Sequence, residues 1–234
     1  MSNRYYAPGP DHARRVQLLF ARIAPCYDLI NDLQSFGLHR LWKSDLAKWA
    51  RVKPGERALD LCCGTGDIAW KIRRAGATVV GIDFSREMLD SAKANLGDGP
   101  GLSWTCGDAL RLPFSDGSFD LITVGYGLRN LANLERGLAE VRRVLKPAGR
   151  LLALDFGKPD NHAWRAIYFG YLRLAVPLLG KMIAGDAAAY GYILDSLRAY
   201  PAQAGISAQL GKLGATVELK NYLGGIMSIH RAQF

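Results

Sequence analysis

Short apolar runs alternate with longer helix-like segments between residues 57 and 156. The segments between the runs, 67–75, 86–96 and 134–145, carry apolar residues at helical spacing. This alternation is typical of strand–helix–strand crossovers, which form a parallel sheet with helices on both faces. The strand-type runs are RALDLC (57–62), TVVGID (78–83), LSWTC (102–106), FDLITVGY (119–126) and RLLALDF (150–156).

The two ends of the chain have a different pattern. Residues 11–50 look mainly helical, and a second helical region covers about 160–200. Two further strand-type runs, 216–223 and 226–232, are separated by a pair of glycines, and strands joined so closely pair antiparallel. The expected fold class is therefore α/β, with a mostly parallel seven-stranded sheet and an antiparallel C-terminal hairpin.

Composition adds a bound on the class of protein. The 234 residues are 49% hydrophobic, which suits one globular domain with an ordinary core. A net charge of +9 suits an anionic partner, such as a lipid surface or nucleic acid, although solubility alone explains it equally well. No block of consecutive basic residues and no nucleic-acid motif is present, so we expect no nucleic-acid partner. No pattern indicates an oligomeric state.

The cysteines and the N-terminal sequence bear on location. Cys26, Cys62, Cys63 and Cys106 have neither zinc-type spacing nor a disulfide-framework pattern, so we expect no metal site and a reducing setting. The first residues are polar and lack the apolar core of a signal peptide. No run of about 18 uncharged apolar residues occurs. These features predict a cytoplasmic protein.

The bend after the first strand-type run is the first candidate site. Small residues there make a tight turn, or they let a ligand approach the backbone. Gly64-Thr65-Gly66 lacks the third glycine of the dinucleotide fingerprint, and Asp67 would repel a pyrophosphate. A cofactor with a ribose and no phosphate fits better, and S-adenosylmethionine is one. Asp60 or Asp67 would favour its ammonium group.

Acidic residues lie at the ends of the next two strand-type runs, with Asp83 closing TVVGID and Asp108 two residues beyond LSWTC. Asp83 suits the ribose hydroxyls, or alternatively a turn or cap near Ser85. Asp108 suits the exocyclic amine of adenine, or alternatively a plain turn. Gly125, at the end of the fourth run, would permit close approach of the ligand. The carboxyl ends of parallel strands meet at one edge, so these residues would share one site.

Several motifs resemble known methyltransferases. DLCCGTGD, GIDFS, GDALRLPFSDGSFD, GLRN and LKPAGR resemble class I S-adenosylmethionine-dependent methyltransferases. FARIAPCYDLIN, GLRN, DFGKP, AGDAAAYGYI and GGIMSIHR resemble, more narrowly, the family that C-methylates ubiquinone and menaquinone precursors. The resemblance covers nearly the whole chain beyond about residue 16.

The resemblance implies a Rossmann-like class I methyltransferase fold and S-adenosylmethionine as cofactor. It implies a helical arm at 1–50 that covers the substrate, and a methyltransferase domain at 51–234 with a helical insertion at about 160–200 on the substrate side. Three residues depart from the family pattern, namely Cys26, Gly125 and Asp155. The cofactor contacts it implies are Thr65, Asp83, Asp108 and Ala109, with close backbone from Gly64, Gly66 and Gly125.

The implied reaction is methylation of a ring carbon in a prenylated quinol, with demethylmenaquinol first and a ubiquinone-pathway benzoquinol as alternative. The remaining alternative is that the methyl group is transferred to another small hydrophobic acceptor. Arg129 would favour a phenolate, or else form a surface ion pair. Tyr190, Asp186 and His230 would relay the proton, although Tyr190 also suits a core and His230 a satisfied strand position.

Residues 161–184 combine apolar and basic positions. On a helical wheel an apolar stripe shares one side, with Arg165, Arg173 and Lys181 spread over the other, and Pro177 should break or kink the helix. The stripe is either core or a wall for a prenyl tail beside an anionic membrane surface, which would make the protein peripheral to the membrane. The stripe comprises Ile167, Tyr168, Tyr171, Leu172, Ala175, Leu178, Leu179 and Met182.

Two rival functions belong to other classes. One is a nicotinamide-dependent reductase on a related sheet, which the missing glycine and Asp67 disfavour. The other is a catalytically silent, methyltransferase-like binding module, which the intact GLRN and GGIMSIHR segments disfavour.

Overall fold

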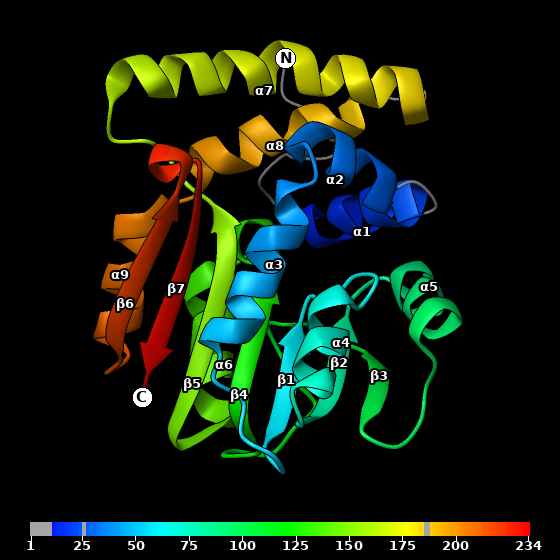
Figure 1. The fold of residues 1–234 in the computed structure, drawn as a ribbon, viewed down its shortest axis with the longest axis vertical. Helices are drawn as coiled ribbons and strands as arrows, with labels where there is room; N and C mark the ends of the chain where they lie inside the picture. The colour runs from blue at the N-terminus through cyan, green and yellow to red at the C-terminus, as the bar shows by residue number, and fades with distance from the viewer. Residues whose placement is uncertain (1–10, 25–26, 185–187) are drawn as a thin grey trace.

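A single mixed sheet forms the centre of the computed structural model, which describes residues 11–24, 27–184 and 188–234 (Figure 1). Seven strands run in the order β3-β2-β1-β4-β5-β7-β6. The first five pair in parallel, and β7 pairs antiparallel with both β5 and β6, which confirms the predicted fold class. The strands are β1 (Arg57–Leu61), β2 (Thr78–Asp83), β3 (Leu102–Cys106), β4 (Phe119–Gly125), β5 (Leu145–Phe156), β6 (Thr216–Tyr222) and β7 (Met227–Gln233).

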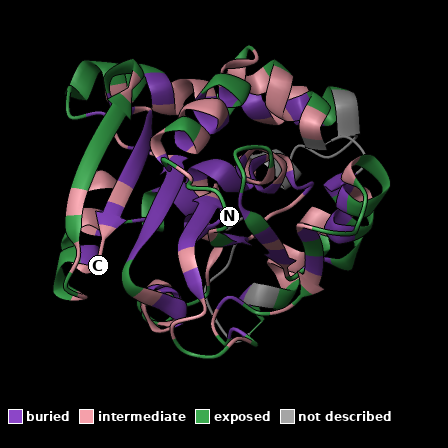
Figure 2. Cartoon of the chain, turned by 60° about the horizontal axis from the view of Figure 1, so that its bottom comes forward, coloured by how far each residue is buried: buried purple, intermediate pink, exposed green. Residues whose placement is uncertain are grey.

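Helices cover both faces of the sheet. One apolar cluster joins one face to α3 (Leu38–Trp49), α4 (Asp67–Arg74) and α5 (Arg86–Leu96). A second cluster joins the other face to α6 (Leu134–Val144) and α9 (Ala202–Lys212). The inner strands of the sheet are accordingly largely buried, whereas the edge strand β6 is mostly exposed (Figure 2).

Strand β1 shows how the two clusters arise from the sequence. Its side chains alternate between faces, so Ala58 packs with α4 while Leu59 and Leu61 pack in the other cluster. All three are at most 1% exposed. Burying each leucine contributes about 1.5–3 kcal/mol, which fixes the register of the strand.

A layer of helices lies beyond the carboxyl ends of the parallel strands (Figure 1). It consists of α1 (His12–Ile23), α2 (Tyr27–Ser35), α7 (His162–Ala184) and α8 (Ala188–Ala199). Two short 3-10 helices, η2 (Leu128–Asn130) and η3 (Leu223–Gly225), lie at the ends of β4 and β6. The Tyr171 hydroxyl of α7 donates to the Gln34 carbonyl of α2 at 2.7 Å, which joins the two halves of this layer.

Two local expectations were wrong. Helix α7 runs without a break across Pro177, because a proline removes only one hydrogen bond and the packing of α7 on α8 holds the rest of the helix. Strand β5 begins at Leu145 rather than at 150, because Leu145 already pairs with Phe119 of β4. The register then shifts, with Ala148 in a left-handed conformation, before the pairing resumes at Arg150.

The apolar stripe of α7 also divides differently from the helical wheel. Tyr168, Leu172 and Val176 are buried against the domain. Ile167, with other members of the expected stripe, is exposed. The helical periodicity predicted for this segment is correct. However, α7 has two apolar sides, and only one of them packs against the core. Within the described ranges, no helix has the length and apolar character needed to cross a bilayer.

Arg150 ties the segment between α3 and β1 to the middle of the sheet. Its guanidinium donates to both Glu56 carboxylate oxygens at 2.9 and 2.7 Å, and its Nε donates to the Ala50 carbonyl at 2.7 Å. Both side chains are largely buried. Burial alone would raise the pKa of Glu56, but the hydrogen bonds from Arg150 and the Lys53 N–H, together with the charge of Arg150, lower it. Such a pair is costly to break from one side.

We expect Arg150→Ala to lower the free energy of unfolding by about 3 kcal/mol, because Glu56 loses its partner while partly buried. Urea unfolding followed by circular dichroism measures the change. Lys146→Ala is the control, because Lys146 forms a 2.8 Å pair with Asp120 but is 42% exposed, and its loss should cost less than about 1 kcal/mol. Equal losses in the two variants would contradict the role given to Arg150.

Candidate active site

The loop between β1 and α4 depends on left-handed backbone. Cys62, Gly64 and Gly66 have φ of 53°, 54° and 86°, and Gly66 precedes the first turn of α4. A Cβ at Gly66 would collide with the ring of Trp104, so only glycine fits there. The turn brings the amino end of α4, with its partial positive charge, to the carboxyl edge of the sheet.

Asp83 closes β2 and holds this loop in place. Its Oδ2 accepts from the Gly64 N–H at 2.8 Å, and its Oδ1 accepts from the Ser85 N–H at 2.9 Å. Burial raises the pKa of the Asp83 carboxyl, and the two backbone donors act against that rise. Asp83 therefore stabilises the turn at Ser85, and it also lies in the wall of a cavity.

That cavity, of about 110 Å³, gathers most of the predicted cofactor residues. Gly64, Asp83, Asp108, Ala109 and Gly125 all line it. Asp108 is exposed and its Oδ1 accepts from the Leu110 N–H at 2.8 Å, while Ala109 is buried. The residues predicted from separate strand ends thus lie together around one cavity.

Helix α1 covers this cavity from outside the sheet. Val16, Gln17 and Phe20 line it, and the Gln17 amide donates to the Phe84 carbonyl at 3.4 Å. A Cβ at Gly125 would collide with the side chain of Ile68, so the floor is close to the helix behind it. The N-terminal helices therefore form a wall of the site. The motifs in the sheet did not identify the individual residues of this wall.

A smaller polar cavity continues from the first. Asp60, Thr65 and Asp67 line it, and Gly64 and Gly125 are shared with the larger one. Asp60 is buried, with the Ala69 N–H and Thr123 hydroxyl donating to it at 3.0 and 2.6 Å. Burial raises the pKa of Asp60 to about 7. A cationic group placed here would favour the ionised carboxylate.

Thr65 and Asp67 connect the loop to the N-terminal helices. The Thr65 hydroxyl donates to Asp28 Oδ1 of α2 at 3.2 Å. The ammonium of Lys43, on α3, donates to Asp67 Oδ2 at 3.0 Å. Burial, followed by the charge of Asp67, raises the pKa of Asp28. The arm is thus attached to the loop by polar contacts at both of its inner helices.

Helix α3 supplies two buried polar residues that the sequence analysis missed. His39 and Lys43 lie one turn apart, on the same buried side as Trp42 and Leu46. The Nδ1 of His39 lies 2.9 Å from the Ser35 hydroxyl, and burial, then the charge of Lys43, lowers the pKa of His39 to about 4. The sequence signal that could have identified them is their position, because both are polar residues in the apolar stripe of a helix.

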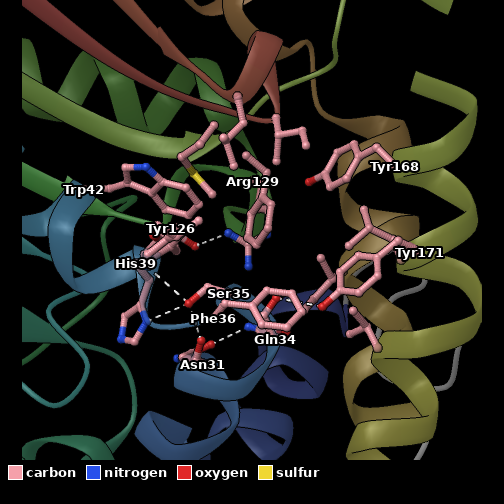
Figure 3. Close-up of a pocket in the computed structure, with 18 of the residues that line it drawn as sticks. Asn31, Gln34, Ser35, Phe36, His39, Trp42, Tyr126, Arg129, Tyr168 and Tyr171 are labelled. Carbon is pink, nitrogen blue, oxygen red and sulfur yellow. Dashed lines mark hydrogen bonds between the residues drawn. The ribbon is translucent and has the colours of Figure 1, made fainter. Parts of the chain in front are cut away.

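An apolar cavity of about 310 Å³ lies beside the cofactor cavities (Figure 3). Side chains from α2, α3, α7 and α8 surround it, with aromatic rings from Trp42, Tyr168 and Tyr192 among them. Tyr126 lines this cavity and both of the others. The two kinds of compartment therefore meet at one side chain.

Arg129 forms part of the wall of the apolar cavity. Its Nη1 donates to Asp155 Oδ1 and to the Tyr126 carbonyl, each at 2.8 Å, and its Nη2 donates to the Tyr192 hydroxyl at 3.2 Å. The guanidinium also lies 4.5 Å from the centre of the Phe156 ring. Only 4% of the side chain is exposed, so the surface ion pair considered from the sequence is excluded.

The other predicted catalytic residues are not brought to this wall. His230 is buried in β7 and lines neither cavity, and its Nε2 lies 3.0 Å from the Gln203 carbonyl. Burial lowers its pKa, as expected for a satisfied strand position, and this placement does not support a proton relay. The side chain of Tyr190 and the whole of Asp186 lie outside the described residues.

Carboxylates and cysteines in the described chain are not arranged as a metal site. No group of three His, Cys, Asp or Glu residues there is close enough to hold an ion. The polar groups at the strand ends instead suit an adenosine with an amino-acid tail. Asp83 and Asp108 offer acceptors, the loop offers backbone amides, and Asp60 offers a carboxylate for an ammonium group.

Comparison with a solved structure supports the fold. A methyltransferase from Thermotoga maritima that depends on S-adenosylmethionine has a TM-score of 0.66, at 18% identity. The match covers 92% of this chain and 98% of that one. At this identity the likeness shows the fold alone.

Two curated relatives are closer in sequence. A 2-phytyl-1,4-naphtoquinone methyltransferase from Trichormus variabilis is 41% identical, over 92% of this chain and 98% of its own. A demethylmenaquinone methyltransferase from Desulfitobacterium hafniense is 40% identical, over 94% of this chain and 90% of its own. The model of the ubiE/COQ5 methyltransferase family matches residues 10–233. The chain therefore belongs to the ubiE/COQ5 methyltransferase family and is an S-adenosylmethionine-dependent methyltransferase.

Proposed function

We propose that the chain methylates a ring carbon of a prenylated quinol, with demethylmenaquinol as first candidate. The observation that carries this proposal is the meeting, at Tyr126, of a cavity that contains the strand-end carboxylates and a larger apolar cavity that has Arg129 in its wall. The names of the two relatives, which refer to a phytyl naphthoquinone and to demethylmenaquinone, support it. A benzoquinol and another small hydrophobic acceptor are the alternatives.

The cofactor would lie along the strand ends. Asp83 would accept from the ribose hydroxyls, and Asp108 with Ala109 would hold the adenine. The loop at Gly64 and Thr65 would take the methionine end, with the amides of the turn toward the carboxylate. Gly66 makes that turn possible. When bound, S-adenosylmethionine supplies a methyl group on a positively charged sulfur, which is already electrophilic.

The residues of the chain then have two tasks, to align the acceptor and to raise the electron density of its ring. A phenolate oxygen does the second for the adjacent ring carbon. Arg129 is placed for this, because a buried cation lowers the free energy of an anion beside it. Tyr190 or Asp186 stays the prediction for the group that takes the proton.

The arm of residues 1–50 and the insertion at about 160–200 would act together as the substrate cover. Helices α2 and α3 from the arm, and α7 and α8 from the insertion, surround the apolar cavity. A long isoprenoid chain needs an apolar opening through which it can leave the cavity. The mouth of the apolar cavity, where it meets solvent, carries exposed apolar side chains of this kind. Phe36 is 83% exposed there, and Ile167 and Leu223 are 63% and 52% exposed.

The same mouth favours contact with the surface of an anionic membrane. Leu174, Leu178 and Met182 continue the exposed apolar side along α7. Arg173 and Lys181 are exposed on the same helix, and Arg165 is half-buried. Exposed apolar patches beside cations suit a lipid interface, where a prenylated substrate resides. The protein would thus be cytoplasmic and peripheral to the membrane.

The test of the reaction itself is mass spectrometry of the quinones in a strain that lacks this chain. Accumulation of a demethylated naphthoquinone supports the first candidate, and accumulation of a benzoquinone precursor supports the alternative. An unchanged quinone profile would overturn the proposal. Calorimetry separates the rival reductase, since binding of NADH without S-adenosylmethionine would favour that class.

Asp83→Ala should raise the dissociation constant of S-adenosylmethionine about tenfold or more. Hydrogen bonds to a charged group contribute about 1.5–3 kcal/mol, and the variant also frees the Gly64 amide. Isothermal titration calorimetry measures the change. Asp90→Ala, which removes an exposed acid from α5, is the charge-matched control and should bind normally. Normal binding by Asp83→Ala would place the ribose elsewhere.

Arg129→Lys should lower turnover at least about tenfold while cofactor affinity stays nearly constant, because a point charge cannot reproduce the planar fork that contacts Asp155. Lysine keeps the positive charge, so Asp155 is not left without a cation. Steady-state kinetics and calorimetry measure the two quantities. Arg142→Lys, on α6, is the control. A parallel loss of cofactor binding would assign Arg129 to the cofactor site instead.

Replacing Arg165, Arg173 and Lys181 together by Gln should strongly weaken binding to anionic vesicles at low salt, since each basic residue near such a surface contributes about 1 kcal/mol. Vesicle co-sedimentation measures it, and activity on a short-tailed soluble quinol should change little. The control replaces three exposed basic residues near the opposite edge of the sheet by Gln. Co-sedimentation equal to that of the parent would refute the membrane contact. The control residues are Lys53, Arg74 and Lys212.

A further inference from the structure

The hydroxyl of Tyr168 is a buried polar group that the proposed reaction has not used. Tyr168 lies in the first half of α7, and 5% of the residue is exposed. Its hydroxyl oxygen is buried and has no hydrogen-bond partner within the described part of the chain. An unpaired buried hydroxyl is costly, and a folded protein keeps one mainly where a ligand completes it.

Two other tyrosine hydroxyls of the same cavity have hydrogen-bond partners. The Tyr171 hydroxyl donates to the Gln34 carbonyl at 2.7 Å, and the Tyr192 hydroxyl accepts from Arg129 at 3.2 Å. Figure 3 shows the Tyr168 hydroxyl pointing from α7 into the cavity, on the side where Arg129 lies. Among the polar groups of the cavity are therefore a cation bonded to the frame and, on the side of α7, a hydroxyl without a partner in the described chain.

The two groups differ in what they can do for a ligand. Arg129 is permanently charged and suits an anionic oxygen. Burial raises the pKa of Tyr168, and the charges of Arg129 and Asp155 act in opposite directions on it. The phenol is therefore neutral and protonated, so it is a hydrogen-bond group and not a base.

A quinol ring carries two oxygens on opposite sides, and only one of them activates the carbon to be methylated. We propose that Tyr168 binds the second ring oxygen, opposite the oxygen that Arg129 stabilises, and so aligns the ring between the two side chains beside the cofactor cavity. This assignment rests on the proposed function and deepens it. The ring is then held at two points, and a rotation in its own plane by less than half a turn leaves Tyr168 unpaired.

The test compares two substrates in the intact enzyme. One is a soluble prenylated naphthoquinol with both hydroxyls, and the other is the corresponding 1-naphthol, which retains the activating hydroxyl and lacks the second. Tyr168→Phe should lower kcat/KM for the quinol about tenfold, mainly through KM, and should leave the naphthol within about twofold. The thermal midpoint of the variant should not fall, because the substitution removes an unpaired hydroxyl.

A second readout does not need the cofactor. Trp42 and Trp164 line the cavity, so quenching of their fluorescence by either ligand reports binding alone. Tyr168→Phe should weaken quinol binding about tenfold and naphthol binding little. Tyr171→Phe is the matched control, since it breaks the bond to Gln34 and should affect both ligands alike.

The outcomes separate the two proposals. If the parent enzyme methylates neither prenylated ring, the proposed function fails. If the parent is active and Tyr168→Phe loses equally on both substrates, or on neither, the role of Tyr168 is wrong while the proposed function stands.

Discussion

The ion pair between Arg129 and Asp155 is the contact on which the layout of the site depends. Both side chains are 4% exposed, and they come from η2 and β5, two neighbouring elements at the carboxyl edge of the sheet. Removing two charges from water is costly, so the pair persists only because further donors and rings surround it. The guanidinium also bonds the Tyr126 carbonyl, which sets the side chain common to all the cavities. One buried cation thus positions the border between the polar and apolar compartments.

The separation of these compartments follows from the order of the elements. The strand ends and their glycine turns lie inside the sheet layer, where little movement is available, and they carry the acids. The helices that build the apolar cavity come from both ends of the chain and pack on one another. The same sheet can therefore keep its cofactor residues while the helical layer determines which acceptor fits.

The sheet and most cofactor residues could be predicted because their signals are local. Asp83 ends one strand-type run and Asp108 follows the next by two residues, and the parallel arrangement then brings them to one edge without further information. The partner of Arg129 could not be predicted, because Asp155 is 26 residues away and only the folded sheet brings the two together. His230 was ambiguous since both sides of β7 are buried, and only the register places it beside Gln203. The family assignment made from the motifs is confirmed.

The N-terminal helices link access to the two cavities. Helix α1 lies over the cofactor cavity, and α2 and α3 form part of the acceptor cavity, so one stretch of chain covers both. The polar contacts of Asp28 and Lys43 with the glycine loop hold this stretch against the domain, together with buried apolar side chains such as Ile30 and Leu46. A displacement of this stretch that exposed the cofactor cavity would therefore expose the acceptor cavity as well, so access to the two cavities is coupled through one piece of chain.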